Sequence, residues 1–231
     1  MVPRNSKSRR FLSIAPMPLF VIAITEPSGE VTEMFDNARL QHQIEFILEI
    51  DRLKQVLRQT IITDKSRREN SAEHSWHAAL MTIVLSEYAE NPQIDVFQVV
   101  KMLLIHDLVE IDVGDTYCYD INARKDQHER ELQAAKRIFN LLPKDQARQL
   151  QLLWDEFEAR QTLNSRFANA LDRLQPLITN YYTHGKAWQE HGVKRHQVVA
   201  RNCSIEDGAP ELWRYALRLI EDAVRRGILS E

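Results

Sequence analysis

The stretch KMLLIHDLVEIDVGD, residues 101–115, places five ionisable side chains directly after an apolar run. On a helix, His106 and Glu110 project from one face because they are four residues apart, and Asp107 follows about 100° around the axis. Burying these groups without partners would cost roughly several kcal/mol. A divalent cation would compensate them, and imidazole with carboxylate suits Mn, Fe, Co, Ni or Zn better than Ca. The pattern therefore indicates a metal site.

Further ligands must come from other segments of the chain. His74 opens a helix whose later residues are apolar, and Asp172 lies inside the apolar stretch FANALDRLQPL, an unusual place for a carboxylate. Asp172 could instead pair with Arg173 or Arg166, and Glu73 could either orient His74 or be simply exposed. Both readings remain open, but His74 and Asp172 are the better candidates to complete a metal site.

The elements that would carry these residues are helices. Apolar side chains recur at helical spacing in residues 36–60, 71–90 and 96–110, and helical segments continue to the C-terminal third. Few glycines and prolines, 6 and 8, favour long helices, and no strand-like alternation of useful length occurs. The sequence therefore predicts an all-α fold in which Arg58 lies at the end of the first long helix.

The ordered pattern H…HD…D resembles the HD superfamily of metal-dependent phosphohydrolases. The segments RENSAEHS and HDLVEIDVGD, the latter with the spacing HD-x2-E-x3-GD, resemble its 5'-deoxynucleotidase branch over about residues 36–183. The resemblance implies an HD-domain helical bundle with the metal site between helices. It also implies a phosphomonoesterase that releases phosphate from nucleoside 5'-monophosphates.

The resemblance assigns a role to each matching residue. Glu110 and Asp115 match the catalytic carboxylates, and Arg58 matches an arginine that holds the substrate phosphate, although it could instead pair with Asp51 or Glu49. The implied cofactor is one divalent metal ion (Mn, Co, Mg, Fe, Ni or Zn), with the ligands His74, His106, Asp107 and Asp172.

The sequence also departs from that branch. Gln59 stands where those nucleotidases usually carry a tryptophan, and the following connector is one residue longer. Sugar and base preference therefore stay open. Two alternatives remain: a phosphodiesterase or pyrophosphohydrolase of nucleotides, for which His77 and Asp115 are spare ligands for a second metal, and a metal-dependent nucleotide-binding protein without turnover.

Three parts of the chain are expected. Residues 1–33 read as a poorly ordered N-terminal extension, with a secretory signal as the alternative, because Pro16 and Pro18 interrupt the apolar run that follows a basic start. Residues 34–183 would form the HD phosphohydrolase domain. Residues 184–231 would be a helical extension packed on the same domain, where apolar anchors could cover the site or contribute to a homodimer.

Composition bounds the partners and the compartment. A net charge of −3 without a basic stripe argues against nucleic acid, and no apolar segment is long enough to span a bilayer. Two cysteines, Cys118 and Cys203, give no disulfide framework and favour a reducing cytoplasm. We therefore expect a cytoplasmic enzyme with a small nucleotide or another phosphate monoester as its partner.

Overall fold

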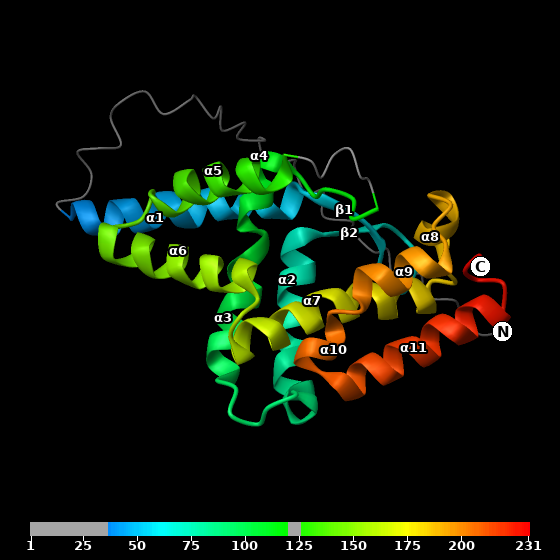
Figure 1. The fold of residues 1–231 in the computed structure, drawn as a ribbon. Coiled ribbons are helices and arrows are strands. Elements are labelled where there is room, and N and C mark those ends of the chain that lie inside the picture. The colour runs from blue at the N-terminus through cyan, green and yellow to red at the C-terminus, as the bar shows by residue number, and fades with distance from the viewer. Residues whose placement is uncertain (1–36, 120–125) are drawn as a thin grey trace, which may run out of the picture. The chain divides into compact units, whose positions relative to one another are not determined.

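The computed structural model describes residues 37–119 and 126–231 (Figure 1). The described residues form one compact unit. The expectations for residues 1–33 lie outside the described part of the chain. Within that part, no helix is both long and apolar enough to cross a membrane.

The described residues are mainly helical, with one two-stranded antiparallel sheet, so the all-α prediction is confirmed. Short 3-10 helices, η2 to η4, connect or extend several elements. In chain order the elements are α1 (Ala38–Ile50), η2 (Asp51–Gln55), β1 (Leu57–Ile61), β2 (Arg68–Asn70), α2 (Ser71–Leu85), η3 (Ser86–Tyr88), α3 (Val96–Ile105), η4 (His106–Val109), α4 (Glu110–Val113), α5 (Gln127–Phe139), α6 (Lys144–Ala159), α7 (Leu163–Tyr182), α8 (Lys186–Glu190), α9 (Arg195–Asn202), α10 (Ile205–Gly208) and α11 (Pro210–Arg225).

The first predicted helix is too long. The α-helix begins after the N-cap Asn37 and ends at Ile50, and the chain then enters strand β1, which pairs with β2. A run of β-branched residues, Thr60 to Thr63, favours the extended backbone because their side chains lose rotamer freedom in a helix. Arg58 therefore lies on a strand rather than at a helix end.

The third predicted helix is interrupted at the residues of chemical interest. Helix α3 ends at Ile105, His106 to Val109 form a 3-10 turn, and a short α-helix follows from Glu110. A 3-10 turn within a helix changes the angular spacing of side chains, so His106 and Glu110 do not share a face in the way that regular helical spacing predicts. Gly114 ends this segment with a φ of 74°, a left-handed conformation that glycine adopts without steric cost.

Two hydrophobic clusters flank this 3-10 turn. Met102 and Leu103, before the turn, belong to a cluster shared by α2, α3, α7 and α11. Leu108 and Val109, within the turn, belong to a second cluster with residues of α1, α5 and α6. Each buried aliphatic side chain contributes about 1.5–3 kcal/mol. The turn is therefore anchored by hydrophobic burial on both sides, which fixes His106 between the two clusters.

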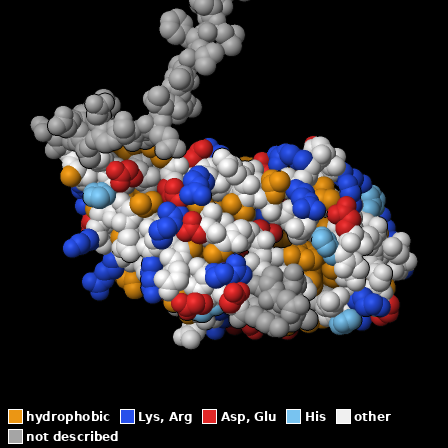
Figure 2. Space-filling model, turned by 90° about the horizontal axis from the view of Figure 1, so that it is seen from above, with side chains coloured by type: hydrophobic (Ala, Val, Ile, Leu, Met, Phe, Trp, Pro, Cys, Tyr) orange, Lys and Arg blue, Asp and Glu red, His pale blue; other side chains and the backbone are white. Residues whose placement is uncertain are grey.

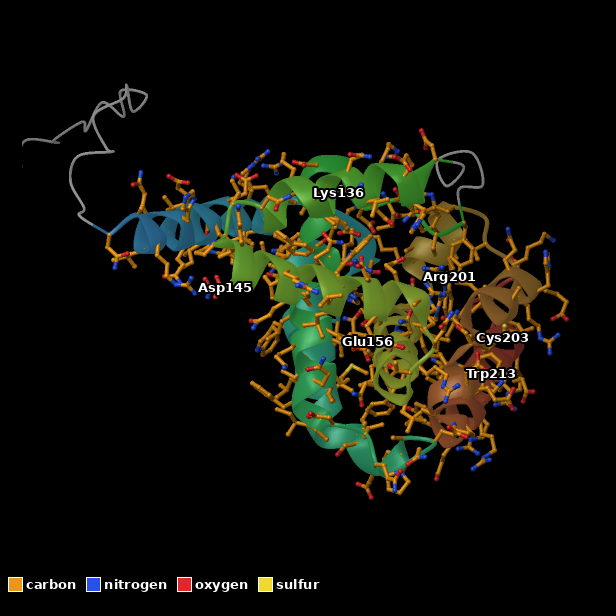
Figure 3. All side chains as sticks on the ribbon, turned by 60° about the vertical axis from the view of Figure 1, so that its left-hand side comes forward. Lys136, Asp145, Glu156, Arg201, Cys203 and Trp213 are labelled. Atoms are coloured by element: carbon orange, nitrogen blue, oxygen red, sulfur yellow. The ribbon has the colours of Figure 1, made fainter. Side chains whose placement is uncertain are left out.

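Polar contacts join the helices at the surface. Arg39 on α1 donates two hydrogen bonds of 2.8 Å to Asp145 in the first turn of α6. Figure 3 labels Asp145. Both side chains are exposed, so this ion pair contributes little stability. It records that α1 and α6, which are about 100 residues apart in the sequence, lie next to each other.

Helix α7 carries Asp172 through the centre of the unit. Thr162 caps its first turn in a reciprocal arrangement with Ser165, and the helix continues through Pro176 to Tyr182. Trp213 and Ile220 of α11 share a hydrophobic cluster with Leu171 of α7. The C-terminal helices thus complete the core around the helix that carries Asp172 (Figure 1).

Candidate functional site

The four predicted metal ligands lie together. The Nε2 atom of His74 is 3.0 Å from Oδ1 of Asp172, and Nε2 of His106 is 3.0 Å from Oδ1 of Asp107 and 3.4 Å from Oδ1 of Asp172. Ligand atoms of His74, His106 and Asp107 are within 4.8 Å of one another. Three elements, α2, η4 and α7, supply these side chains.

Hydrogen bonds orient both imidazoles for cation binding. The Nδ1–H of His106 donates to the carbonyl of Leu103 at 2.9 Å, and that of His74 donates to Oε1 of Gln175 at 3.0 Å. Because Nδ1 of each ring donates to an oxygen, Nε2 is the ring atom that faces the carboxylates, and its lone pair can bind a cation once Nε2 is deprotonated. The Nε2 atom of His106 is also buried without a hydrogen-bond partner among the described residues. These donors fit a divalent cation.

The electrostatics of the cluster lead to the same conclusion. Burial would lower the pKa of His106, but Asp107 and Asp172 raise it to about 9. Burial would raise the pKa of Asp172, but the neighbouring imidazoles of His106 and His74 hold it well below its ordinary value. Two buried carboxylates thus attract positive charge, and a divalent cation can replace the proton that they would otherwise favour on the imidazole.

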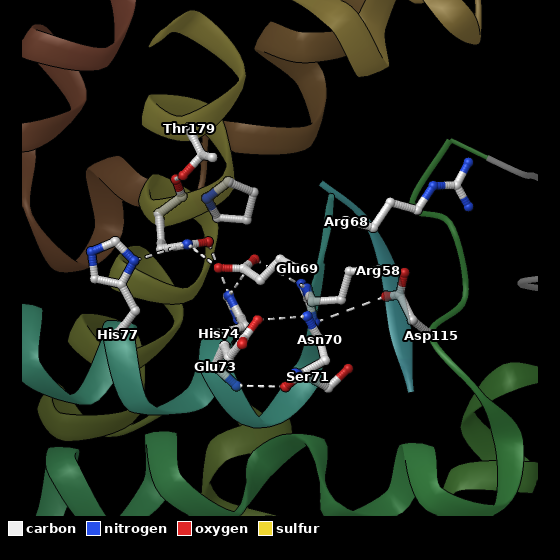
Figure 4. A network of polar contacts seen from close by, with 12 residues as sticks. Arg58, Arg68, Glu69, Asn70, Ser71, Glu73, His74, His77, Asp115 and Thr179 are labelled. Carbon is white, nitrogen blue, oxygen red and sulfur yellow. Dashed lines mark hydrogen bonds and ion pairs between the residues drawn. The ribbon is translucent and has the colours of Figure 1, made fainter. Parts of the chain in front are cut away.

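Sequence reasoning missed the residue that orients His74. Gln175, one turn beyond Asp172 on α7, accepts from His74 and donates to Oε1 of Glu69 at 2.7 Å (Figure 4). Glu69 can only accept, so the amide nitrogen of Gln175 must face it and the amide oxygen must face His74. The same nitrogen is 3.1 Å from Nδ1 of His77, which leaves His77 outside the cluster.

The interpretation that Glu73 orients His74 is wrong. Glu73 closes a capping box with Asn70 at the start of α2 and accepts two hydrogen bonds from Arg67, so it does not orient His74. Asn70 is the N-cap of α2. Ser71 donates its hydroxyl hydrogen bond to Glu110. A glutamate three residues after Asn70 is itself the sequence signal for this cap.

Glu110 and Asp115 lie beside the four predicted metal ligands, around Arg58. The NH1 atom of Arg58 is 2.8 Å from Oδ2 of Asp107, 3.8 Å from Oε1 of Glu110 and 3.9 Å from Oδ1 of Asp115. Glu49 and Asp51, the partners considered for Arg58 as an alternative, form ion pairs with other surface residues instead. The strand β1 therefore directs Arg58 inward, between the metal ligands and the two further carboxylates.

Burial shifts the titration of this group. Burial would lower the pKa of the Arg58 guanidinium, but Asp107, Glu110 and Asp115 raise it above its usual value. Burial, followed by the charge of Asp107, raises the pKa of Glu110 well above that of a free carboxyl group. Burial is also the main cause of the raised pKa of Asp115. A carboxyl group with a raised pKa keeps its proton to a higher pH than a free carboxyl group does, as a general acid requires.

A cavity of about 320 Å³ opens onto these residues. Its volume is in the range of small-molecule sites. Gln59, which stands where the 5'-deoxynucleotidase branch usually carries a tryptophan, lines this cavity. Its Oε1 is 3.2 Å from Nε2 of His191. Sequence reasoning missed most of the remaining wall, which residues 116–119 and helices α5 to α9 supply. Its polar and aromatic residues include Tyr117, Tyr119, Gln127, Arg160, Arg173, Asn180, Trp188, Arg201 and Asn202.

A second group of potential ligands lines the same cavity. His128 and Glu131 of α5 and Glu158 of α6 place one ligand atom each within 4.8 Å of one another. Burial raises the pKa of both glutamates. None of the three stood out in the sequence, because two come from one charged amphipathic helix and the third from the end of the next.

Comparison with known proteins is consistent with this geometry. A family model described as HD domain matches residues 50–213. A crystal structure of a predicted metal-dependent phosphohydrolase from Magnetospirillum magnetotacticum MS-1 is 52% identical, with a TM-score of 0.81, over 85% of this chain and 98% of that one. A conserved hypothetical protein from Pyrococcus furiosus is 26% identical, with a TM-score of 0.53, over 79% and 99% of the two chains.

A curated relative of this chain is the human 5'-deoxynucleotidase HDDC2. It is 29% identical over 136 residues, which are 58% of this chain and 65% of the human protein. The chain thus spans just under two thirds of the length of that relative. The bovine protein of the same name is 28% identical over an alignment of the same length.

Proposed function

Because this chain belongs to the HD domain family, we propose that it is a metal-dependent phosphohydrolase that releases phosphate from nucleoside 5'-monophosphates. One observation carries the proposal. Two imidazole nitrogens and two carboxylates converge beside Arg58, Glu110 and Asp115, at the wall of one cavity. The similarity to proteins named 5'-deoxynucleotidase supports the choice of a nucleotide substrate.

We propose that His74, His106, Asp107 and Asp172 bind one divalent metal ion. The tautomers fixed by Leu103 and Gln175 and the buried, unpartnered Nε2 of His106 support this assignment. Such an ion supplies Lewis acidity at neutral pH, which favours the attack of water on phosphorus. Nitrogen and oxygen donors are compatible with Mn, Co, Mg, Fe, Ni or Zn.

The remaining polar residues would act on the phosphate. Arg58 neutralises its charge and fixes its orientation through the planar guanidinium. Glu110, with its raised pKa, donates a proton to the leaving alkoxide. Asp115, on the far side of Arg58, orients the phosphate and that guanidinium. Removal of Glu110 should therefore abolish turnover but leave the metal ligands in place.

A second candidate function is hydrolysis of phosphodiester or pyrophosphate bonds in nucleotides. The cluster of His128, Glu131 and Glu158 favours it, because a second cation in the same cavity would suit a two-metal reaction. The number of tightly bound ions per chain separates these readings. One ion supports the phosphomonoesterase, and two support the alternative.

We also propose that the chain forms a homodimer. Large apolar side chains on one side of α2, at i, i+4, i+7 and i+8 spacing, are 43–64% exposed, and the neighbouring α3 carries two more. Exposed apolar faces of this kind mark protein interfaces. The residues are Trp76, Leu80, Ile83 and Val84 on α2, and Phe97 and Leu104 on α3.

We also propose how the chain divides into parts and in which compartment it acts. Shared burial of Trp213 and Leu171 supports a C-terminal extension, residues 184–231, that is packed on a phosphohydrolase domain of residues 34–183. Two free cysteines support a cytoplasmic location. On the face seen in Figure 2, basic side chains are dispersed among acidic and apolar ones, which fits a small-molecule partner better than nucleic acid.

A phosphate-release assay tests the proposed function. The purified chain should release phosphate from at least one nucleoside 5'-monophosphate when Mn²⁺ or Co²⁺ is added, and lose that activity in EDTA. Glu110→Gln should abolish release while the protein still binds the metal. Failure to release phosphate from a panel of ribo- and deoxyribonucleotides under every divalent cation tried would refute the proposal.

A further inference from the structure

Three arginines line the cavity beyond Arg58, and each comes from a different element. Arg160 is the C-cap of α6, Arg173 lies on α7, and Arg201, which Figure 3 labels, lies on α9. None of the three has an ion pair within 4 Å among the described residues. Arg58, in contrast, has four carboxylates within that distance. Among the described residues, the cavity wall therefore contains Arg58, which is surrounded by carboxylates, and a separate group of three arginines without a carboxylate within 4 Å.

Arg173 is the most deeply buried of the three, with 6% of its surface exposed. Its NH1 donates to the carbonyl of Arg201 at 2.7 Å, but its Nε is buried without a partner among the described residues. The neighbouring Asp172 offers little compensation, because its carboxylate contacts both histidines.

Arg160 occupies a backbone position that suits glycine. Its φ is 54°, in the left-handed region, where a side chain costs about 1 kcal/mol relative to glycine. Unfavourable backbone conformations of this kind occur at functional sites, where the side chain has a role that outweighs the cost. A guanidinium directed to a cavity with two further arginines is a group that would serve such a role.

Other buried polar atoms in the cavity wall are also unpartnered. The hydroxyl of Tyr117 and Oδ1 of Asn180 have no hydrogen-bond partner among the described residues, and both side chains line the cavity. Buried polar groups in proteins nearly always have partners. Together with the unpaired Nε of Arg173, they indicate that a polar ligand fills this part of the cavity.

We propose that Arg160, Arg173 and Arg201 form a subsite for a second phosphoryl group of the substrate. The inference rests on the proposed function, in which the scissile phosphate lies between Arg58 and the metal ligands. The preferred substrate class is then a mononucleotide with two phosphoryl groups. The second group is attached either to the ribose, as in a 3',5'-bisphosphate, or to the first phosphate, as in a diphosphate.

Calorimetric titration of the full-length, Mn²⁺-loaded protein tests this subsite without turnover. The first pair of probes is the 5'-methylenephosphonate of 2'-deoxyadenosine with and without a 3'-phosphate. The second pair is imidodiphosphate and inorganic phosphate. In at least one pair, the member with two phosphoryl groups should bind about tenfold more tightly. This is the value expected for one added set of charge-assisted hydrogen bonds. The pair that shows the gain locates the second phosphoryl group.

Variants connect the gain to the arginines. Arg160→Gly and Arg201→Gln should each reduce the affinity ratio to less than about threefold, because each removes one guanidinium from the subsite. Arg160→Gly also relieves the left-handed backbone, so its unfolding temperature should not fall. Arg148→Gln, an exposed arginine on the same helix α6 that does not line the cavity, should keep the full ratio.

The outcomes separate this subsite from the proposed function. If neither probe with two phosphoryl groups binds more tightly than its partner, the subsite does not exist. The same conclusion follows if both variants keep the gain in affinity. If the gain is present and depends on the arginines but no nucleotide releases phosphate, the subsite stands and the proposed function fails. Release of phosphate from a monophosphate without any gain in affinity supports the function and refutes the subsite.

Discussion

Replacing Gln175 with leucine should weaken metal binding through His74. Gln175 and His74 are almost fully buried, and the amide oxygen is the acceptor of the Nδ1 proton at 3.0 Å. Leucine removes that acceptor, so His74 loses the contact that fixes its tautomer and ring orientation. Loss of such a hydrogen bond lowers metal affinity by roughly 10–100-fold. Titration with Co²⁺, followed by its absorption spectrum, measures this change.

The same substitution should lower stability. An unpaired buried Nδ1–H costs about 1–3 kcal/mol, and Glu69, which is 4% exposed, loses the 2.7 Å hydrogen bond from the amide nitrogen. A total of about 3 kcal/mol corresponds to a fall of roughly 6–12 °C in the unfolding temperature of a domain of this size. Adding Glu69→Gln should restore part of this stability, because no buried charge is left unpaired, but it should not restore metal affinity.

Thr179→Val provides the matched control. Thr179 is buried one turn further along α7, and its hydroxyl donates only to the backbone carbonyl of Gln175. This variant should lose about 1 kcal/mol of stability and keep its metal affinity. Wild-type Co²⁺ affinity in Gln175→Leu would refute the reasoning, since His74 would then be oriented without its partner.

Three further predictions follow from the same structure. Asp107→Ala should remove the stabilisation that added Co²⁺ gives to the wild type. At a hundredfold excess over Kd this stabilisation is about 2.7 kcal/mol, or roughly 5–11 °C in the unfolding temperature by differential scanning calorimetry. An equal rise of the unfolding temperature in the variant would exclude Asp107 as a ligand. Glu110→Gln should stabilise the metal-free protein, and more at pH 8 than at pH 5. The folded state raises the pKa of Glu110, so this group's contribution is present below the unfolded pKa and is lost as the pH rises through the folded value; thermal unfolding in EDTA at both pH values checks this, and an equal effect at both would contradict it. Ile83→Asp should convert a dimer to a monomer in light scattering coupled to gel filtration, because it places a charge on the exposed face of α2; an unchanged mass would place the interface elsewhere or show that none exists.

The convergence of the four proposed metal ligands could be predicted because the signal in the sequence is local and ordered. An apolar run followed by His106 and Asp107, and a carboxylate inside an apolar helix at Asp172, are unusual enough to stand out in a single sequence. The helices could be predicted from the periodicity of apolar residues. The structure places these four residues together, as the pattern required.

The parts that could not be predicted depend on contacts between distant segments. Strand β1 needs β2 as its partner, and neither shows alternation of useful length, so Arg58 was assigned to a helix. The 3-10 turn at His106 results from packing against two hydrophobic clusters, which local spacing does not encode. Gln175 is an ordinary glutamine in the sequence, and its role becomes visible only when α2, β2 and α7 are assembled.

Anomalous diffraction from crystals loaded with Mn²⁺ or Co²⁺ tests the central claim most directly. The account predicts one strong peak at about 2.0–2.3 Å from Nε2 of His74 and His106 and from a carboxylate oxygen of Asp107 and of Asp172. A peak only at His128, Glu131 and Glu158, or at no shared position of the four proposed ligands, would contradict it.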